Sequence, residues 1–154
     1  MDGYRKLKLK GVHIRWSKKN VFPEYDNTSG PLVSQRRINR LKILLILLIK
    51  EEKDRILRAF KNFAKKRYDK PITVSMDLNT TIERIHRTFV CKSESAYGES
   101  DESKIWITGN EKMSSTYLFG TMLHECLHYM CTFNDKWISE SDEHAIMRSL
   151  GEDC

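Results

Sequence analysis

The chain has 154 residues, of which 40% are hydrophobic and 31% are charged, and its formal net charge is +6. These values are typical of one soluble globular domain. The longest apolar run, Leu41 to Ile49, is interrupted by Lys42 and is too short to cross a bilayer. The first 30 residues also lack the apolar segment of a secretory signal. We therefore expect an intracellular protein with no membrane partner.

The cysteines support this expectation. The chain has four of them, with no Cys-x-x-Cys pair. We interpret them as reduced thiols of an intracellular protein, and Cys126 and Cys131 as small structural residues rather than metal ligands.

The charge is divided unevenly along the chain. Residues 1–70 carry 20 Lys and Arg against 7 Asp and Glu, whereas residues 71–154 carry 7 against 14. The two parts therefore have net charges of +13 and −7. The basic part favours a polyanion such as DNA as a partner, although a solvated helix surface with a basic tail would have the same composition. The candidate nucleic-acid contacts are Lys6, Lys8, Lys10, Arg36, Arg37, Arg40, Lys65, Lys66 and Arg67.

The N-terminal residues alternate between apolar and basic side chains. Residues 4–16 do so in two short phases around Gly11. The pattern predicts a strand with a bend at the glycine, or a basic arm that only a partner orders. Residues 17–31 have the composition of a loop. We expect residues 1–30 to precede a single domain over residues 31–154.

A long basic helix is expected next. From about Leu32 to Tyr68, apolar residues recur at three- and four-residue steps, and Lys and Arg occupy the other faces. The pattern fits one extended helix or two helices packed end to end. Pro71 ends it, because proline removes a backbone donor. Residues 31–70 thus form a basic helical part, followed by residues 71–154.

Three short runs after the long helix predict strands. They are Ile72–Met76, Ile82–Cys91 and Lys104–Thr108, with a polar turn at residues 93–103. We expect them to form a small antiparallel three-stranded sheet. With the helices, this sheet gives an α+β fold.

Two helices are expected in the last third of the chain. Ser114 or Ser115 can cap a helix that runs to about Phe133. A last helix is expected over Glu140–Leu150, with Gly151 at its C-terminal cap. We expect the three-stranded sheet to pack on the first of these helices.

The first of these two helices carries a His-Glu-x-x-His motif, from His124 to His128. Residues four apart share a helix face, so both histidines can bind one metal ion, with Zn²⁺ expected. A metal ion lowers the pKa of bound water, and Glu125 is placed to accept the proton as a general base in peptide hydrolysis. In the alternative reading, both histidines are core residues bonded to backbone, and Glu125 is at the surface.

A catalytic zinc ion needs a third protein ligand, which the last helix can supply. Glu143 lies on the same helix face as Met147 and Leu150, so helical phase slightly favours Glu143 over His144. If His144 is the ligand, Glu140 is placed to orient its second nitrogen. Glu140 itself is the least favoured third donor, and these residues leave the choice between Glu143 and His144 open.

Residues 87–154 resemble the SprT-like metalloprotease domain, a family of proteases that act on proteins crosslinked to DNA. The shared features are a turn ending at Gly98, a strand with Ile at alternate positions, the motif Leu-His-Glu-Cys-Leu-His-Tyr and a later Asn-Asp-Lys turn. The resemblance implies a small zincin-like catalytic domain, Zn²⁺ as cofactor, a protein or peptide substrate and a nuclear or DNA-associated location. It also implies that His124, His128 and His144 are the metal ligands.

The resemblance further implies a substrate-binding edge strand next to the metal helix. In this chain the strand would consist of Ile105, Trp106 and Ile107. The chain departs from the family at Ala145, where a glycine is common, and at Glu143, where gluzincin-type peptidases have an acidic ligand. The departures weaken a DNA-repair role more than a peptidase activity.

Three functions therefore compete. The first is a SprT-like zinc endopeptidase that works near DNA. The second is a gluzincin-like protease without a DNA role, such as a viral, toxin or processing enzyme. The third is a non-enzymatic domain that binds zinc or nucleic acid. In the first of these, Tyr97, Tyr117 or Tyr129 would stabilise the oxyanion, and the sequence does not select among them.

Overall fold

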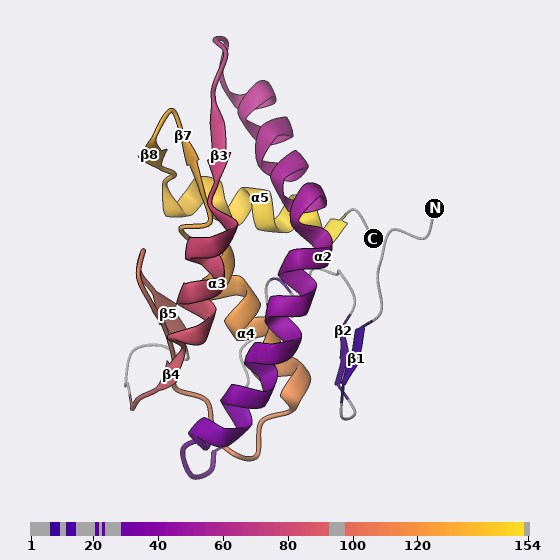
Figure 1. Ribbon diagram of the computed structural model, residues 1–154, viewed down its shortest axis with the longest axis vertical. Helices are drawn as coiled ribbons and strands as arrows, with labels where there is room; N and C mark the ends of the chain where they lie inside the picture. The colour runs from indigo at the N-terminus through magenta and orange to yellow at the C-terminus, as the bar shows by residue number, and fades with distance from the viewer. Residues whose placement is uncertain are drawn as a thin grey trace.

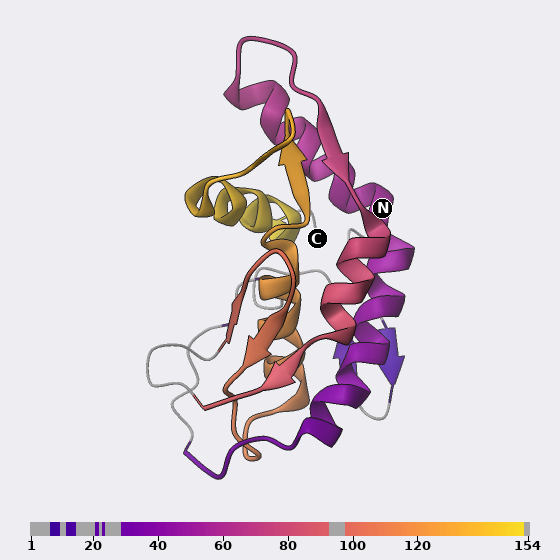
Figure 2. The ribbon, with the colours of Figure 1, turned by 60° about the vertical axis from the view of Figure 1, so that its left-hand side comes forward.

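A computed structural model describes the chain over residues 7–9, 12–14, 21, 23, 29–92 and 98–152. Within these residues the chain is an α+β protein, as predicted, with helices α2 to α5 and two small three-stranded sheets. Figures 1 and 2 show the long helix α2 (Gln35–Arg67) running along the molecule, with the later helices packed beside it.

The structure confirms the long basic helix as one element. The Ser34 side chain caps α2 by accepting a hydrogen bond from the Arg37 N–H, and the chain becomes extended at Tyr68, shortly before Pro71. At 1.5 Å per residue, α2 is about 50 Å long. Its fully buried side chains include Ile38, Leu44, Leu45, Leu48, Ile49, Ile56 and Phe60. Among the described residues, no helix is long and apolar enough to cross a membrane.

The predicted strand Ile82–Cys91 is wrong. This part of the chain forms helix α3 (Leu78–His86) and then the short strand β4 (Phe89–Val90). Asp77 starts the helix, because its carboxylate accepts the Thr80 N–H at 3.1 Å. Two of the β-branched residues that favour a strand, Ile82 and Ile85, instead lie on α3, whose buried face repeats at three- and four-residue steps.

The first sheet contains β3 (Val74–Met76), β7 (Cys131–Phe133) and β8 (Lys136–Trp137), all antiparallel and in that order. Asn134 and Asp135 form the turn between β7 and β8, and both have positive φ. Asn and Asp tolerate this conformation better than most residues, which explains the sharp turn here.

The second sheet contains β4, β6 (Ile105–Ile107) and β5 (Gly98–Ser100) in that order. β6 pairs parallel with β4 and antiparallel with β5. The predicted single antiparallel sheet is therefore wrong. Its first and third strands belong to different sheets, and its second strand is mostly helix α3.

Helix α4 (Ser115–Leu127) carries the histidine motif. Ser114 caps it by accepting the Tyr117 N–H. The helix ends six residues before the predicted end at Phe133, because Tyr129 has a φ of 59° and the chain then enters β7. Helix α5 (Glu140–Glu152) starts where predicted and continues past the predicted end.

The N-terminal pattern corresponds to two strands, β1 (Leu7–Leu9) and β2 (Val12–Ile14), paired antiparallel. The two apolar phases are therefore separate strands of one hairpin rather than a single bent strand. Figure 1 shows this hairpin beside α2. Lys6 and Lys10 lie outside the described residues. Further along, Val21 is fully buried in the core.

Candidate metal centre

Three histidine side chains converge at the C-terminal end of α4. The Nε2 atom of His128 lies 3.3 Å from that of His124 and 3.2 Å from that of His144. All three donor atoms lie within 4.8 Å of one another. His124 is in the last turn of α4, His128 is its C-cap and His144 is on α5. This group can hold one metal ion.

Hydrogen bonds at the second ring nitrogens orient two of these rings. The Nδ1 of His124 donates to the Val21 carbonyl at 2.8 Å, and the Nδ1 of His128 donates to Glu143 Oε1 at 2.9 Å. A carbonyl oxygen only accepts, so His124 carries its proton on Nδ1 and leaves Nε2 as a lone-pair donor. Both bonds are of the kind that fixes metal-binding histidines.

Glu143 contacts the Nδ1 side of the His128 ring and does not belong to the group of three metal donors. Its carboxylate is buried, and its second oxygen accepts the Tyr129 N–H at 2.8 Å. Both oxygens are thus directed at protein donors, which argues against Glu143 as the third ligand. Helical phase correctly predicts that the Glu143 side chain is buried. The buried carboxylate, however, binds the Nδ1 atom of His128 and not the space between the three Nε2 atoms.

Glu140 does not have the expected role. Its Oε1 atom lies 3.8 Å from His144 Nε2, which is the converging nitrogen and not the second one. The Glu140 side chain is 78% exposed. It therefore lies at the open side of the histidine group.

Glu125 directly follows His124 in the sequence, and its carboxyl group is largely buried. Its Oε1 atom accepts a hydrogen bond from Ser100 Oγ at 3.1 Å. Burial raises the pKa of Glu125 to about 7, although the Ser100 hydrogen bond and the positive charge of His128 oppose the rise. A carboxyl group with this pKa exchanges protons near neutral pH.

The histidines differ in basicity. Burial lowers the pKa of His124 to about 4, and burial also lowers that of His144, with repulsion from His128. For His128, burial acts in the same direction, but the hydrogen bond and charge of Glu143 outweigh it and raise the pKa. His124 and His144 are therefore in the neutral, metal-binding form at pH 7.

The histidines and Glu125 line one cavity of about 450 Å³. Strand β5 forms one wall, and Ile138 and the start of α5 form another. Gly98 lets β5 approach α4 closely, because a Cβ there would lie 2.8 Å from Thr121 Cγ2 and 3.3 Å from Glu125 Cγ. The cavity thus places a strand edge next to the carboxyl group and the metal donors.

No family model, curated protein or solved structure matches the chain. The likeness to SprT-like domains therefore rests on the motif residues alone. The chemistry of the site is argued below from its geometry.

The strand predicted to bind substrate is not an edge strand. Ile105, Trp106 and Ile107 form the centre of their sheet, where β4 and β5 occupy both edges of β6. The two isoleucines are completely buried, and the Trp106 ring stacks on Phe89. The edge strand that lines the cavity is β5, which lies before the predicted strand in the sequence.

Of the candidate oxyanion residues, Tyr129 lines the cavity and Tyr117 does not. The third candidate, Tyr97, lies outside the described residues. The Tyr129 ring packs edge-on against Trp137, with ring centres 5.4 Å apart. The indole N–H of Trp137 donates to Glu102 at 2.7 Å, which ties β8 to the turn after β5.

Arg84 is a buried site residue that the sequence does not reveal. Its guanidinium donates to the carbonyl oxygens of Glu125 (3.3 Å), Cys126 (3.1 Å) and Asp101 (3.0 Å). The last carbonyls of a helix have no partner within the helix, so Arg84 satisfies two of them next to the histidine motif. Arg84 lies 41 residues before Glu125, and no local pattern connects the two.

The candidate nucleic-acid contacts have different environments. Arg37 binds the loop before α4, with Nη1 on the Glu111 carbonyl (2.9 Å) and Nη2 on the Met113 carbonyl (2.6 Å). It is therefore a structural residue, and its prediction as a phosphate contact is not supported. Arg36 and Arg40 are exposed near the start of α2.

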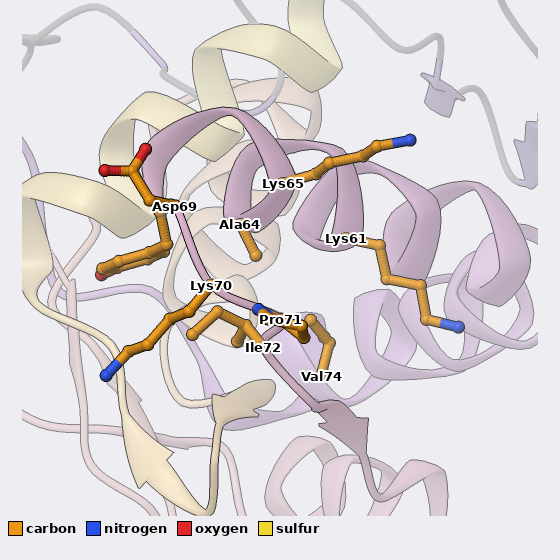
Figure 3. A pocket seen from close by; sticks show the side chains of 9 residues that line it. Lys61, Ala64, Lys65, Asp69, Lys70, Pro71, Ile72 and Val74 are labelled. Carbon is orange, nitrogen blue, oxygen red and sulfur yellow. The ribbon is translucent and has the colours of Figure 1, made fainter.

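The other basic cluster lies at the far end of α2. Lys65, Lys66 and Arg67 are exposed in its last turn. A cavity of about 460 Å³ lies beside them, between the helix and the chain that enters β3. Figure 3 shows Lys61 and Lys65 directing their amines outward at its rim, across from Pro71 and other apolar side chains. None of the histidines or Glu125 lines this cavity.

Proposed function

We propose that the chain is a SprT-like, zinc-dependent endopeptidase that acts on DNA-associated proteins. One observation carries the proposal, namely the convergence of three imidazole Nε2 atoms beside the largely buried carboxyl group of Glu125 in a single cavity. Two histidines four residues apart, a third donor from a later helix and a carboxylate outside the donor group suit a hydrolytic zinc site.

The donor group fits Zn²⁺. Catalytic zinc sites have three protein ligands and an open position, and three neutral imidazoles suit zinc. None of the described cysteines belongs to the donor group, whereas closed structural sites commonly contain cysteine. The gluzincin-like alternative is less favoured, because Glu143 is bound to His128 and Tyr129.

The catalytic chemistry centres on Glu125. Zinc, when bound, would supply a Lewis acid that polarises the scissile carbonyl and lowers the pKa of a water molecule. Glu125 accepts the proton of the attacking water and later delivers it to the leaving amine. The Ser100 hydroxyl holds the carboxylate in place for both transfers.

Strand β5 is the proposed substrate edge. Among the described strands it pairs only with β6, so its other edge can pair with an extended peptide. Its residues line the cavity that contains Glu125 and the histidines. Tyr129 lines the same cavity, and we assign to it the stabilisation of the oxyanion.

Substitution of Glu125 tests the peptidase proposal. Glu125→Gln should retain fold and zinc but lower kcat on an unfolded protein by about 10²–10⁴-fold, because an amide does not accept the proton. Glu83→Gln is the control, since Glu83 is an exposed acid on α3 outside the cavity. Cleavage by the Glu125 variant at the wild-type rate would contradict the proposal.

The DNA association rests on the basic residues of α2. Arg36 and Lys66 are roughly 45 Å apart along the helix, a span of about 13 base pairs. Replacing Lys65, Lys66 and Arg67 by alanine should weaken duplex binding and reduce its salt dependence, because fewer counterions are released. Lys112→Ala, an exposed lysine outside α2, is the control. Unchanged affinity and salt dependence in the triple variant would contradict this assignment.

A further inference from the structure

The cavity of about 460 Å³ beside the C-terminal end of α2 has an apolar lining. Ala64 contributes to it from the helix, and Pro71, Ile72 and Val74 contribute from the chain that enters β3. Figure 3 shows Ala64 on one side of the opening and the other three residues across from it. Ligand pockets commonly have volumes of about 300–1,000 Å³, so this cavity can hold apolar side chains of a ligand.

Three exposed lysines surround this apolar lining. Lys61 and Lys65 are four residues apart and therefore share a face of α2, whereas Lys70 lies in the segment after the helix. Asp69 is the acidic residue that lines the cavity, so the lysines outnumber the acids there. The cavity therefore suits a ligand that carries negative charges next to apolar groups.

Strand β3 forms one wall of the cavity and is an edge strand. Among the described strands it pairs only with β7, and Figure 1 shows it between β7 and the C-terminal half of α2. The Thr73 carbonyl accepts the Asn134 N–H, and the Thr73 N–H donates to the Asn134 side chain. Both backbone groups of Thr73 thus face β7. Because these groups alternate in direction along a strand, those of Val74 face the other edge, where an extended peptide can pair.

A nucleic acid fits this cavity less well than a peptide does. Nucleobases bind mainly by stacking on aromatic rings. Tyr68 is the aromatic residue of the lining, and its ring already packs edge-on against Phe133, with ring centres 6.2 Å apart. The Arg67 guanidinium lies 5.6 Å from the centre of the Tyr68 ring. The remaining lining is aliphatic, and the edge of β3 matches a peptide backbone.

We propose that the groove between the end of α2 and β3 is a docking site for an extended, acidic segment of a protein partner. The segment pairs with the edge of β3 at Val74 and places apolar side chains against the aliphatic lining. Its carboxylates meet the lysines at the rim, which favours acidic over basic partners. None of the candidate metal ligands lines the groove, so the inference does not depend on the proposed peptidase activity.

Synthetic peptides test the charge preference. We suggest fluorescent nine-residue peptides in which valine alternates with glutamate, threonine or lysine. Fluorescence anisotropy should show the glutamate peptide binding more tightly than the threonine peptide, by about 1.4–5-fold for each ion pair formed, and the lysine peptide binding most weakly. The preference should shrink at high salt. Equal binding of the three peptides would overturn the inference.

N-Methylation of the glutamate peptide tests strand pairing without any change in the protein. In a β-ladder, alternate residues direct their N–H groups towards the neighbouring strand. One peptide is methylated at its valines and another at its glutamates. One of the two should bind more weakly by about 2–12-fold for each hydrogen bond lost, and the other should bind nearly as well as the parent peptide. Equal effects of the two methylation patterns would contradict strand pairing.

Protein variants assign the binding to the groove. Val74→Pro removes the N–H at the free edge, and edge strands tolerate proline, so this variant should fold and bind the glutamate peptide about 2–12-fold more weakly. Val74→Ala keeps the N–H and is its control. Lys61→Ala and Lys70→Ala should each lower the glutamate preference by about 1.4–5-fold. Lys53→Ala, an exposed lysine of α2 outside the cavity, should leave it unchanged. If Val74→Pro does not fold, the methylated peptides decide.

The remaining outcomes identify other occupants. Displacement of the glutamate peptide by a nine-nucleotide oligothymidylate, with no effect of Val74→Pro, would mean that the lysines bind any polyanion and would overturn the inference. Self-association that Val74→Pro abolishes, without peptide binding, would assign the edge to a second copy of the chain and would also overturn it. If the wild-type protein cleaves no peptide while docking behaves as described, the inference stands and the peptidase proposal fails.

Discussion

The Nδ1–H of His124 donates to the backbone carbonyl of Val21, 103 residues earlier in the chain, at 2.8 Å. Val21 is itself fully buried. The N-terminal segment thus supplies an orienting bond to a candidate metal ligand, and it helps to build the site. A boundary at residue 30 would separate Val21 from the candidate metal ligand that it orients.

Two truncations test this relationship. Removal of residues 1–24 should weaken zinc binding by about 10–100-fold, because His124 loses the acceptor that orients its ring. Removal of residues 1–16 keeps Val21 and should have a much smaller effect. Zinc affinity is measured by chelator competition. Equal affinities for the two truncated proteins would show that the Val21 bond is unimportant.

Glu143→Gln tests the carboxylate behind His128. Loss of its negative charge should weaken zinc binding at pH 7.5 by about 10–100-fold. His128 binds metal only when neutral, and Glu143 raises its pKa above 6.5. In the wild-type protein, proton competition therefore lowers zinc affinity as the pH falls through this raised pKa.

The variant should also respond differently to pH. In Glu143→Gln the pKa of His128 falls, so the loss of zinc affinity on acidification should begin at lower pH. The measurement is zinc affinity between pH 5.5 and 8, with Glu83→Gln as the control. An unshifted pH dependence would mean that Glu143 does not set the basicity of His128.

Ser100→Ala tests the positioning of the proposed general base. The Ser100 hydroxyl stabilises the ionised carboxylate, so its removal should raise the pKa of Glu125 above about 7. A general base works when ionised, and activity is lost as the pH falls through its pKa. The fall in kcat/KM should therefore be larger at pH 6 than at pH 8. Ser75→Ala, on the remote strand β3, is the control, and an equal loss at both pH values would point to a purely structural role.

Arg84→Ala should be strongly destabilising. The substitution removes three hydrogen bonds to carbonyl oxygens and leaves a cavity, so the free energy of unfolding should fall by about 2–4 kcal/mol. Arg87→Ala is the matched control, because Arg87 is exposed and makes a single 3.8 Å ion pair with Glu83. That control should cost less than about 1 kcal/mol. Urea unfolding measures both values, and similar values would contradict the buried role of Arg84.

Local patterns predict the elements whose signals are strong. Helix α2 follows from its apolar spacing, and the starts of α4 and α5 follow from Ser114 and Ser139, whose hydroxyls accept helix N–H groups. The sequence pattern does not predict helix α3, because its β-branched residues are typical of strands. Its start signal, the capping Asp77, is present in the sequence but lies outside the run that suggests a strand.

The contacts that complete the site have no local signal. Any residue can offer a backbone carbonyl, so nothing in the sequence distinguishes Val21. Ser100 and Arg84 act on Glu125 across 25 and 41 residues, distances at which sequence periodicity carries no information. The third donor is a different case, because a one-residue rotation of α5 exchanges Glu143 and His144, and only the packing of α5 on α4 separates them.

X-ray absorption at the zinc edge of the purified, zinc-loaded protein tests the central claim most directly. The expected result is one zinc ion per chain with three imidazole nitrogen ligands and one further light atom from solvent. His144→Ala should lose an imidazole contribution, whereas Glu143→Gln should retain all three. Absence of stoichiometric zinc, or four protein ligands in a closed site, would contradict the account of a catalytic metal centre.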